Sequence, residues 1–465
     1  MIDSIALQDD TIVAISTPHG MGGIAVIRVS GNDAVQLVSR RWHGKPIAEM
    51  ASHTAHLGSM VGSNGETLDE VVLTVFRAPR SFTGEDVIEI SCHGSLWIQQ
   101  QIVNTLIDVG CRAATGGEFT RRAFANGKLD LSQAEAVADI IASSSQASHR
   151  VAMNQMRGVF SRRIAELREK LLHFVSLIEL ELDFSEEDVT FADRSKLLDL
   201  AGQIHAVIAH LTESYATGNV IKNGLPVAIV GQTNAGKSTI LNALLHDDKA
   251  LVSDIQGTTR DVIEDTTVIG GTMFRFIDTA GIRHSTDTVE AMGIERTFRK
   301  LDQARIVRWV IDGTDSAQAV AQFMHDNIEP HCKGKCLIAV INKADVATPA
   351  NVEAIAAAIG AVKHITISAK REPDIALLQQ QVTEAAALPQ IDDNAVIVTN
   401  ARHYEALVRA GHALERSISG LKSGLSGDLV SQDIRECLHY LGEITGEISN
   451  NEILGEIFAR FCVGK

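Results

Sequence analysis

The sequence predicts an α/β multidomain protein in which one α/β module comes first and a second α/β domain is inserted into a helical domain. Three observations predict this fold class. A length of 465 residues suits about two to four domains. Up to about residue 118, segments rich in β-branched residues partly alternate with polar ones. Beyond that, helical periodicity appears on both sides of a segment of short apolar runs and glycine-rich loops.

Composition limits the classes of partner. Hydrophobic residues make up 45% of the chain and charged residues 22%, as in ordinary globular proteins with a sizeable core. The net charge of −16 gives no global attraction to nucleic acid or to an anionic membrane, so an RNA partner needs a local basic face. The six cysteines are scattered, no signal peptide precedes them, and no apolar run approaches the roughly 20 residues that span a bilayer. We expect a cytoplasmic protein that does not cross a membrane.

The first module, residues 1–118, is predicted to contain a sheet and at least one helix. Strand-like runs cover 11–15, 23–29, 69–76 and 86–91, and residues 95–109 suit a helix. Three polar residues of this module could serve a ligand, although from spacing alone surface or paired charges are the favoured explanation: Arg28, Glu85 and His93.

Residues 119–222 are predicted to be helical. Apolar residues recur there at spacings of three and four: Phe160, Ile164, Leu167, Leu171, Phe174, Ile178 and Leu182. The same helix carries basic residues on its other faces, which suit either a solvated surface or a contact with RNA. Residues 383–465 are helical again, and neither helical stretch alone offers much core. We therefore expect residues 223–382 to be a domain inserted between two parts of one helical domain.

The strongest motif runs from Gly231 to Thr239, Gly-Gln-Thr-Asn-Ala-Gly-Lys-Ser-Thr. It follows a buried strand over 225–230 and leads into a helix over 237–245, which is the context that a phosphate-binding P-loop requires. The glycines let backbone N–H groups face phosphate oxygens, Lys237 reaches the β- and γ-phosphates, and Ser238 offers a hydroxyl to Mg²⁺. The motif predicts binding of a nucleoside triphosphate.

Downstream motifs predict that this nucleotide is GTP. A buried strand over 336–341 ends in Asn342-Lys343-Ala344-Asp345. The Asp345 carboxylate can accept hydrogen bonds from N1–H and the 2-amino group of guanine, and adenine has neither donor. A short strand over 364–367 then leads into Ser368-Ala369-Lys370, where a backbone N–H can meet the guanine O6.

Two further segments are predicted to be switches that respond to the γ-phosphate. A strand over 273–277 delivers Asp278-Thr-Ala-Gly281, which places Asp278 near the metal ion. Thr259 can coordinate Mg²⁺ only while the γ-phosphate is present. Many small GTPases place a water-orienting glutamine directly after this glycine, but here the position is Ile282. Water positioning must therefore come from another residue.

Over essentially its full length, the sequence resembles the tRNA-uridine modification GTPase family MnmE, also called TrmE. The resemblance rests on the segments Thr17–Ile24, Ile27–Gly31, Ser81–Asp86, Gly117–Phe124, Asn126–Ala136, Leu182–Glu187, Asp254–Asp261 and the terminal Phe461–Lys465. It implies an N-terminal folate-binding domain that forms a homodimer, a helical domain and an inserted Ras-like P-loop GTPase domain.

The resemblance also implies a function and partners. With MnmG (GidA), an FAD- and NADH-using protein, the family forms a heterotetramer that modifies C5 of the wobble uridine (position 34) of certain tRNAs. The added group is of the aminomethyl or carboxymethylaminomethyl type, and the implied cofactor that supplies the carbon is 5,10-methylene-tetrahydrofolate (or the 5-formyl form). A GTP-switched ribosome-assembly factor that binds rRNA is the alternative, and folate binding distinguishes the two.

Residue matches to the family extend the predicted sites. Asn234 matches the asparagine that holds K⁺, and Glu290 matches the glutamate that orients the attacking water. Cys462 matches the cysteine of the family's C-terminal tail and is included with Glu290 and Asn234 among the candidate catalytic residues. The implied K⁺ ligands are Asn234, Ser253, Ile255 and Thr258, and the implied folate ligands are Arg28, Glu85, Lys128 and Lys465. The nucleotide contacts, from motifs and resemblance together, are Asn234, Ala235, Gly236, Lys237, Ser238, Thr239, Ser253, Asp254, Ile255, Gln256, Gly257, Thr258, Thr259, Asp278, Thr279, Ala280, Gly281, Asn342, Lys343, Asp345, Ser368, Ala369 and Lys370.

Overall fold

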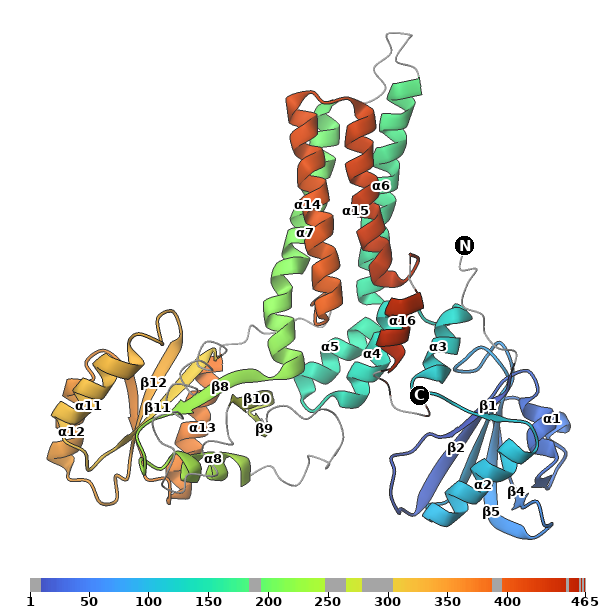
Figure 1. The fold of residues 1–465 in the computed structure, drawn as a ribbon, viewed down its shortest axis with the longest axis horizontal. Helices are drawn as coiled ribbons and strands as arrows, with labels where there is room; N and C mark the ends of the chain where they lie inside the picture. Colours follow the sequence, from blue (N-terminus) through green and yellow to red (C-terminus); the bar gives the residue numbers. More distant parts are fainter. Residues whose placement is uncertain are drawn as a thin grey trace. The chain divides into compact units, whose positions relative to one another are not determined.

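The computed structural model describes residues 10–183, 194–246, 265–277, 304–386, 395–448, 451–459, 461 and 464. The chain divides into two compact units. The first combines residues 1–141, 153–209 and 405–465, and the second combines residues 142–152 and 210–404. Each unit is therefore assembled from segments that are separated in the sequence, as the colours of Figure 1 show.

The first unit opens with a seven-stranded sheet in the order β3-β4-β5-β6-β2-β1-β7. Its strands are β1 (Ile12–Ile15), β2 (Ile24–Ser30), β3 (Trp42–His43), β4 (Thr54–Val61), β5 (Thr67–Phe76), β6 (Val87–His93) and β7 (Arg112–Ala113). Alternate residues of β5 are buried and pack with Ile102 and Leu106 of α2 (Leu96–Asp108), while α1 (Ala34–Ser39) adds to the same core. The four strands and the helix predicted here are confirmed, whereas β3, β4 and β7 were not predicted.

Helices of 8 to 30 residues make up the rest of the first unit, and α7 and α14 run across its boundary with the second. They are α3 (Glu118–Ala125), α4 (Leu131–Ala142), α5 (Gln146–Met156), α6 (Val159–Asp183), α7 (Arg194–Asn223), α14 (Ala401–Ser423), α15 (Gly427–Thr445) and α16 (Asn451–Ala459). The predicted apolar positions of α6 from Phe160 to Ile178 are all buried, and the Leu182 side chain lies outside the described residues.

Helices from the two ends of the helical region share one bundle. Helix α6 packs against α15, and α7 lies beside α14, where His205 Nε2 is 3.0 Å from Glu415 Oε1 (Figure 1). The chain thus leaves the bundle along α7 and returns along α14. The segment between these helices is therefore an insertion, and the predicted multidomain α/β fold class is confirmed.

The second unit contains a six-stranded sheet in the order β13-β12-β11-β8-β10-β9, in which only β9 is antiparallel to its neighbour. The strands are β8 (Leu225–Val230), β9 (Asp265–Ile269), β10 (Thr272–Ile277), β11 (Ile306–Asp312), β12 (Cys336–Asn342) and β13 (Lys363–Thr366). The helices are α8 (Lys237–His246), α11 (Ala317–Phe323), α12 (Pro349–Ala358) and α13 (Glu372–Ala386), with a π-helical turn at Met324–Ile328.

Both faces of this sheet are buried. Val227 and Ile229 of β8 join the core under α8 and α13, whereas Ala228 and Val230 join the core on the opposite face. Such continuous burial is typical of parallel sheets covered by helices on both sides. Because parallel strands end at the same edge, the loops that follow β8, β12 and β13 lie at one edge of the sheet. The four strands predicted in this segment are confirmed, while β9 and β11 were missed.

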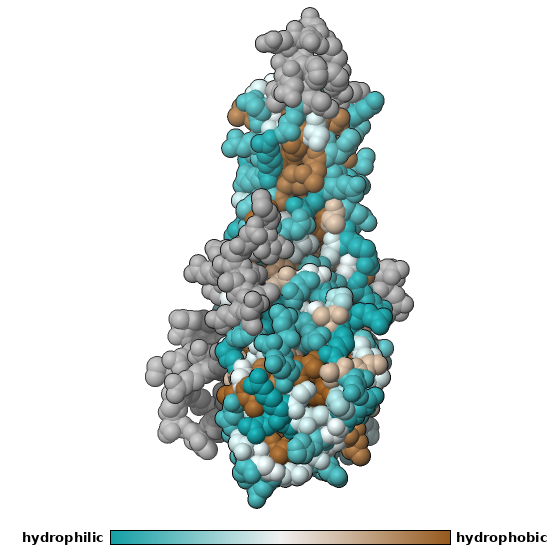
Figure 2. Space-filling view, turned by 90° about the vertical axis from the view of Figure 1, so that its right-hand side faces the viewer, coloured by the Kyte–Doolittle hydropathy of each residue, from teal (hydrophilic) through white to brown (hydrophobic). Residues whose placement is uncertain are grey.

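The surface shown in Figure 2 is mainly hydrophilic, with separate apolar patches. Among the described residues, no helix combines the length and apolar character that crossing a bilayer requires.

Candidate functional site

The P-loop joins β8 to α8, and its two glycines are required by close contacts. A Cβ on Gly231 (φ 151°) would lie 2.1 Å from the carbonyl oxygen of Val310. A Cβ on Gly236 (φ 99°) would lie 2.1 Å from Asn342 Nδ2. Neither distance is compatible with a side chain, and both φ values are ones that glycine adopts most easily. The glycines therefore allow the loop to pack against β11 and β12.

Lys237 and Asn234 have distinct positions on this loop. The Lys237 ammonium donates to the carbonyl oxygens of Gly231 and Gln232, at 2.8 and 2.6 Å, so it lies over the loop that would hold the phosphates. Asn234 has a left-handed backbone (φ 61°), which is uncommon outside glycine, and the residue is exposed. Asn234 is therefore accessible to solvent on this loop.

Asn342 connects the P-loop with the segment that follows β13. Its side chain is buried at 2% exposure. Its Nδ2 donates to the carbonyl oxygen of Ala235 at 2.9 Å, and its Oδ1 accepts from the Ala369 N–H at 3.0 Å. The predicted phosphate and base segments therefore meet through one amide side chain.

The remaining base-recognition residues lie around this contact. Asp345 Oδ1 accepts from the Ser368 hydroxyl at 2.8 Å, and this hydrogen bond lowers the pKa of the Asp345 carboxyl. Lys370 Nζ lies 3.9 Å from Asp345 Oδ2. The Ser368 N–H donates to Asp374 and the Ala369 N–H to Asn342, so these two donors already have partners in the protein.

Asp312, at the end of β11, was not among the predicted site residues. Its Oδ2 pairs with Lys343 Nζ at 2.5 Å, and Lys343 has a left-handed backbone (φ 61°). Burial alone would raise the pKa of Asp312, but hydrogen bonds from Lys343 and Thr314 outweigh it and lower this pKa. In the sequence, Asp312 ends the apolar segment 306–312, but this segment had not been predicted as a strand.

Several predicted residues lie outside the described residues and receive no structural account. These are Ser253, Asp254, Ile255, Gln256, Gly257, Thr258, Thr259, Asp278, Thr279, Ala280, Gly281, Glu290, Cys462 and Lys465.

A second polar site lies in the first unit, around the loop that joins β5 to β6. Within this loop, Ser81 Oγ donates to the Glu85 carbonyl oxygen and accepts from the Gly84 N–H. Gly84 has φ 84°, and a Cβ there would lie 3.1 Å from Asn126 Cβ and 3.3 Å from Lys128 Cγ. The loop is thus packed against the segment that follows α3, and Lys128 Nζ donates to the Pro79 carbonyl oxygen at 2.9 Å.

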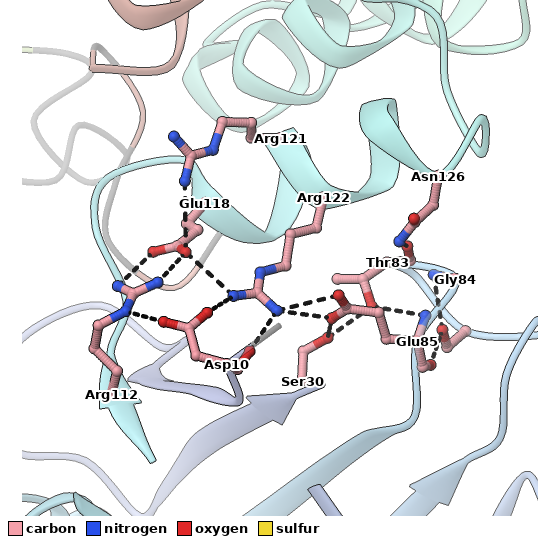
Figure 3. A network of polar contacts seen from close by, with 11 residues as sticks. Asp10, Ser30, Thr83, Gly84, Glu85, Arg112, Glu118, Arg121, Arg122 and Asn126 are labelled. Atoms are coloured by element: carbon pink, nitrogen blue, oxygen red, sulfur yellow. Dashed lines mark hydrogen bonds and ion pairs between the residues drawn. The ribbon is translucent and has the colours of Figure 1, made fainter. Parts of the chain in front are cut away.

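Glu85 points from this loop into a network of charged side chains (Figure 3). Its Oε2 accepts from Ser30 Oγ at 2.7 Å, and its Oε1 pairs with Arg122 at 3.1 Å. The same network contains Asp10, Arg112, Glu118 and Arg121.

Glu118 is the most buried carboxylate of the network, at 1% exposure. Burial alone would raise its pKa, but hydrogen bonds from Arg112 and Thr115 outweigh that effect and lower the pKa of Glu118 to about 2. Asp10, Arg112, Glu118 and Arg122 had not been predicted as site residues. Two signals were available for Glu118 and Arg122: their spacing of four on one helix, and their place in the segment Gly117–Phe124 that contributes to the family resemblance.

Arg28 extends from the neighbouring part of β2. Two of its nitrogens donate to Glu89 Oε1, at 2.9 and 2.8 Å. Its guanidinium lies 5.4 Å from the ring centre of Phe82 and 5.7 Å from that of Phe119. Like Glu85, and like His93 with Asp69, Arg28 is paired within the protein. The structure therefore contains the paired charges that the sequence left open as an alternative.

The end of the chain returns to this sheet. Ser16 Oγ donates to the Gly464 carbonyl oxygen at 3.1 Å, and a Cβ on Gly464 would lie 2.2 Å from the Ile15 carbonyl oxygen. Ile15 pairs with Ile27, next to Arg28. A residue adjacent to the predicted ligand Lys465 thus lies on the strand that pairs with the one carrying Arg28.

Comparisons with known proteins show the family of the chain. A family model described as the MnmE helical domain matches residues 131–462, and one described as the GTP-binding protein TrmE N-terminus matches residues 11–128. A "tRNA modification GTPase MnmE" from Parabacteroides distasonis is 55% identical over 460 residues, covering 98% of this chain and 100% of that protein.

The chain belongs to the MnmE family.

Other MnmE proteins are similarly close. The protein of this name from Bacteroides fragilis is 55% identical over 470 residues, and that from Flavobacterium johnsoniae is 51% identical over 466 residues. Each alignment covers 99% of this chain and 100% of the relative. As a member of the MnmE family with a complete P-loop, the chain is a GTPase.

Solved structures outside the family are more distant. A GTP-binding protein from Sulfolobus solfataricus in complex with GDP is 19% identical and covers 47% of this chain and 66% of that chain, with a TM-score of 0.25. The FeoB G-domain from Methanococcus jannaschii is 22% identical, covering 35% of this chain and 96% of that chain, also with a TM-score of 0.25. These two similarities are too weak to carry an argument.

Proposed function

We propose that this chain is a K⁺-activated GTPase that acts in the modification of the wobble uridine of certain tRNAs. It would work with an FAD- and NADH-dependent MnmG partner and 5,10-methylene-tetrahydrofolate, and add an aminomethyl or carboxymethylaminomethyl group at C5 of uridine 34. One observation carries the proposal: the chain is 55% identical to an MnmE protein over 98% of its length. The same chain contains both a P-loop and an N-terminal network of charged side chains around Glu85.

The nucleotide site supports GTP as its ligand. Asn342 holds the P-loop and the 368–370 segment together, so phosphate and guanine contacts come from a preorganised edge of the sheet. Asp345 offers its carboxylate to the guanine N1–H and 2-amino group. Lys237 can exchange its present contacts with two loop carbonyls for the β- and γ-phosphates, and Ser238 and Thr259 are the proposed Mg²⁺ ligands.

Of the four proposed K⁺ ligands, Asn234 is the one that lies among the described residues. Asn234 is exposed on the P-loop and has a left-handed backbone. Ser253, Ile255 and Thr258 are the other proposed K⁺ ligands. Bound Mg²⁺ and K⁺ would supply positive charge where negative charge develops on the phosphates. Glu290 is proposed to orient the attacking water, a role that Ile282 cannot fill.

The N-terminal site supports a folate ligand. Glu85 provides an acceptor held by Ser30 and Arg122. Arg28, on β2, places its guanidinium over the rings of Phe82 and Phe119. Lys128 packs on the same loop, and Lys465 follows a residue that touches β1. A folate carries N–H donors at its pteridine end and carboxylates at its other end, which suits acceptors and cations in one site. Cys462 is proposed as a catalytic residue of the C-terminal tail.

The proposed domains are residues 1–118 for folate binding and dimerisation, 119–222 and 383–465 for the helical domain, and 223–382 for the GTPase domain. We place the protein in the cytoplasm as a homodimer that joins MnmG in a heterotetramer. The alternative, a ribosome-assembly factor that binds rRNA, is not favoured, because the N-terminal match to TrmE covers the module that such a factor would not need.

The test is complementation of a bacterial strain that lacks its own MnmE. Total tRNA is digested and its nucleosides are quantified by mass spectrometry. The unaltered chain is expected to restore the C5-modified uridines, whereas Lys237→Ala is expected to fail. A strain that expresses the folded chain together with its matching MnmG but still lacks the modified nucleosides would overturn the proposal. Binding of 5-formyl-tetrahydrofolate by the purified chain separates it from the ribosome-assembly alternative.

A further inference from the structure

Arg122 makes an unusual set of contacts for a residue with no predicted role. Its side chain is 3% exposed. Nη1 donates to the Asp10 carbonyl oxygen at 2.8 Å and lies 3.1 and 3.3 Å from the two carboxylate oxygens of Glu85. Nη2 donates to Asp10 Oδ1 at 2.7 Å and contacts Glu118 Oε1 at 3.4 Å. Figure 3 shows this guanidinium between Glu85 on one side and Asp10 with Glu118 on the other.

We propose that Arg122 is a positioning residue for the N-terminal ligand site, and that it acts by holding the Glu85 carboxylate in one orientation as an acceptor. This inference rests on the proposed folate function of that site. Arg122 itself does not touch the ligand in this proposal. It decides which ligands are accepted because an oriented carboxylate selects ligands that carry adjacent N–H donors, such as the amino-substituted edge of a reduced pteridine.

Charge balance within the network supports this role. Three carboxylates, those of Asp10, Glu85 and Glu118, face three guanidinium groups, those of Arg112, Arg121 and Arg122. Among these three arginines, Arg122 is the one with a contact to Glu85. Removing one partner from a buried group of charges leaves the others uncompensated, so Glu85 would lose its orientation without Arg122.

The contacts of the Glu85 side chain also support a positioning role for Arg122. A glutamate side chain has several rotamers, and fixing one of them has an entropic cost that a ligand would otherwise have to offset. Arg122 and Ser30 fix the carboxylate from two sides, at 3.1 and 2.7 Å. The Glu85 side chain nevertheless keeps 14% exposure. Oε2 accepts from both Ser30 and Arg122, whereas Oε1 accepts from Arg122 and keeps a second lone pair that can accept a hydrogen bond from a ligand.

Arg112 provides a matched control. It carries the same charge and contacts the same two carboxylates, Asp10 and Glu118, but it makes no contact with Glu85 among the described interactions. A purely structural role for the network predicts similar consequences for Arg112→Gln and Arg122→Gln. A positioning role predicts that only Arg122→Gln strongly affects binding through Glu85.

The experiment is a thermodynamic cycle on the full-length chain, with 5-formyl-tetrahydrofolate as the probe and calorimetry as the readout. Arg122→Gln is expected to weaken binding by about 10-fold or more in the parent, corresponding to a lost charged hydrogen bond. In the Glu85→Gln background the same change is expected to weaken binding by less than about 3-fold, because the group that Arg122 orients is no longer a carboxylate. Arg112→Gln is expected to remain within about 3-fold of the parent.

Arg122→Lys keeps the charge but not the forked geometry, and an intermediate loss is expected for it. It also serves as the test variant if Arg122→Gln does not fold, as judged by circular dichroism. Equal losses from the Arg122 change in both backgrounds, or equal losses for Arg112→Gln and Arg122→Gln, would overturn the positioning role alone. A folded parent chain that binds no 5-formyl-tetrahydrofolate would overturn the folate function as well.

Discussion

The side-chain amide of Asn342 donates to the carbonyl oxygen of Ala235, 107 positions away in the sequence, at 2.9 Å. The same side chain accepts from the Ala369 N–H at 3.0 Å. One buried residue thus holds together the predicted phosphate-binding loop and the predicted base-binding segment.

Asn342→Ala is expected to weaken GDP binding by about 10-fold or more and to lower the free energy of unfolding by about 1–3 kcal/mol, because two buried hydrogen bonds are lost. Fluorescent-nucleotide titration and urea unfolding measure the two effects. Asn351→Ala is the control, since Asn351 Nδ2 also donates to two backbone carbonyls, those of Gly313 and Asp315. Its nucleotide affinity is expected to change by less than about 3-fold. Equal losses of affinity in the two variants would contradict the role assigned to Asn342.

Asp345→Asn is expected to shift the base preference from guanine toward xanthine. The carboxylate accepts two hydrogen bonds from guanine, and an amide presents one donor and one acceptor, which matches the edge of xanthine. Competition of GTP, XTP and ATP against a fluorescent nucleotide measures the preference. The parent is expected to prefer GTP over ATP by roughly 10⁴-fold or more. Comparable binding of ATP and GTP by the parent would refute guanine recognition.

Hydrolysis of GTP is expected to be faster in K⁺ than in Na⁺. Asn234→Ala is expected to reduce this difference in rate between the two salts. The reason is that Asn234 matches the K⁺-holding position, while Ile282 occupies the place of a water-orienting glutamine. Initial rates at equal ionic strength in KCl and NaCl measure the effect, and nucleotide affinity in both salts is the control. Equal rates in the two salts would exclude K⁺ activation, and Arg260→Ala and Arg283→Ala would then test an arginine supplied in cis.

Glu290→Ala is expected to lower kcat by roughly 10²-fold or more without changing GTP affinity, because water orientation contributes only in the transition state. Single-turnover hydrolysis of saturating GTP in K⁺ measures this. If Glu290 served only the dipole of a helix end, the variant would lose about 0.5 kcal/mol of stability and keep a near-normal rate. A rate equal to that of the parent would rule out the water-positioning role.

Glu118 is expected to make folding stability depend on pH below neutrality. Its pKa falls from an ordinary 4.5 to about 2 in the folded protein. A lowered pKa stabilises the fold above pH 4.5, and this contribution of about 3 kcal/mol is lost as the pH falls from 4.5 through 2. Urea unfolding at several pH values should show this decline in the parent and a much weaker one in Glu118→Gln. Parallel pH curves for the two proteins would contradict the assignment.

Much of the nucleotide site could be predicted from the sequence, because its parts are local. Gly231 and Gly236 lie in the same loop as Lys237, and the strand before this loop and the helix after it are visible as short apolar patterns. Asn342 and Asp345 follow another buried run directly. In such motifs the residue types, their spacing and the adjacent strand already determine which backbone and side-chain groups come together. The buried stripe of α6 was predictable for the same reason.

The tertiary structure decided the contacts between distant segments. Arg122 meets Asp10 and Glu85 across 112 and 37 positions, and no periodicity relates these residues. Gly464 lies on Ser16 across 448 positions, and the packing of α6 on α15 makes one bundle from both sides of the inserted domain. Sequence patterns specify which face of an element is apolar but not which partner covers it. Which groups pair with a buried charge depends on how distant segments pack together. The pairing of Arg122 with Glu85 could therefore be identified only from the tertiary structure.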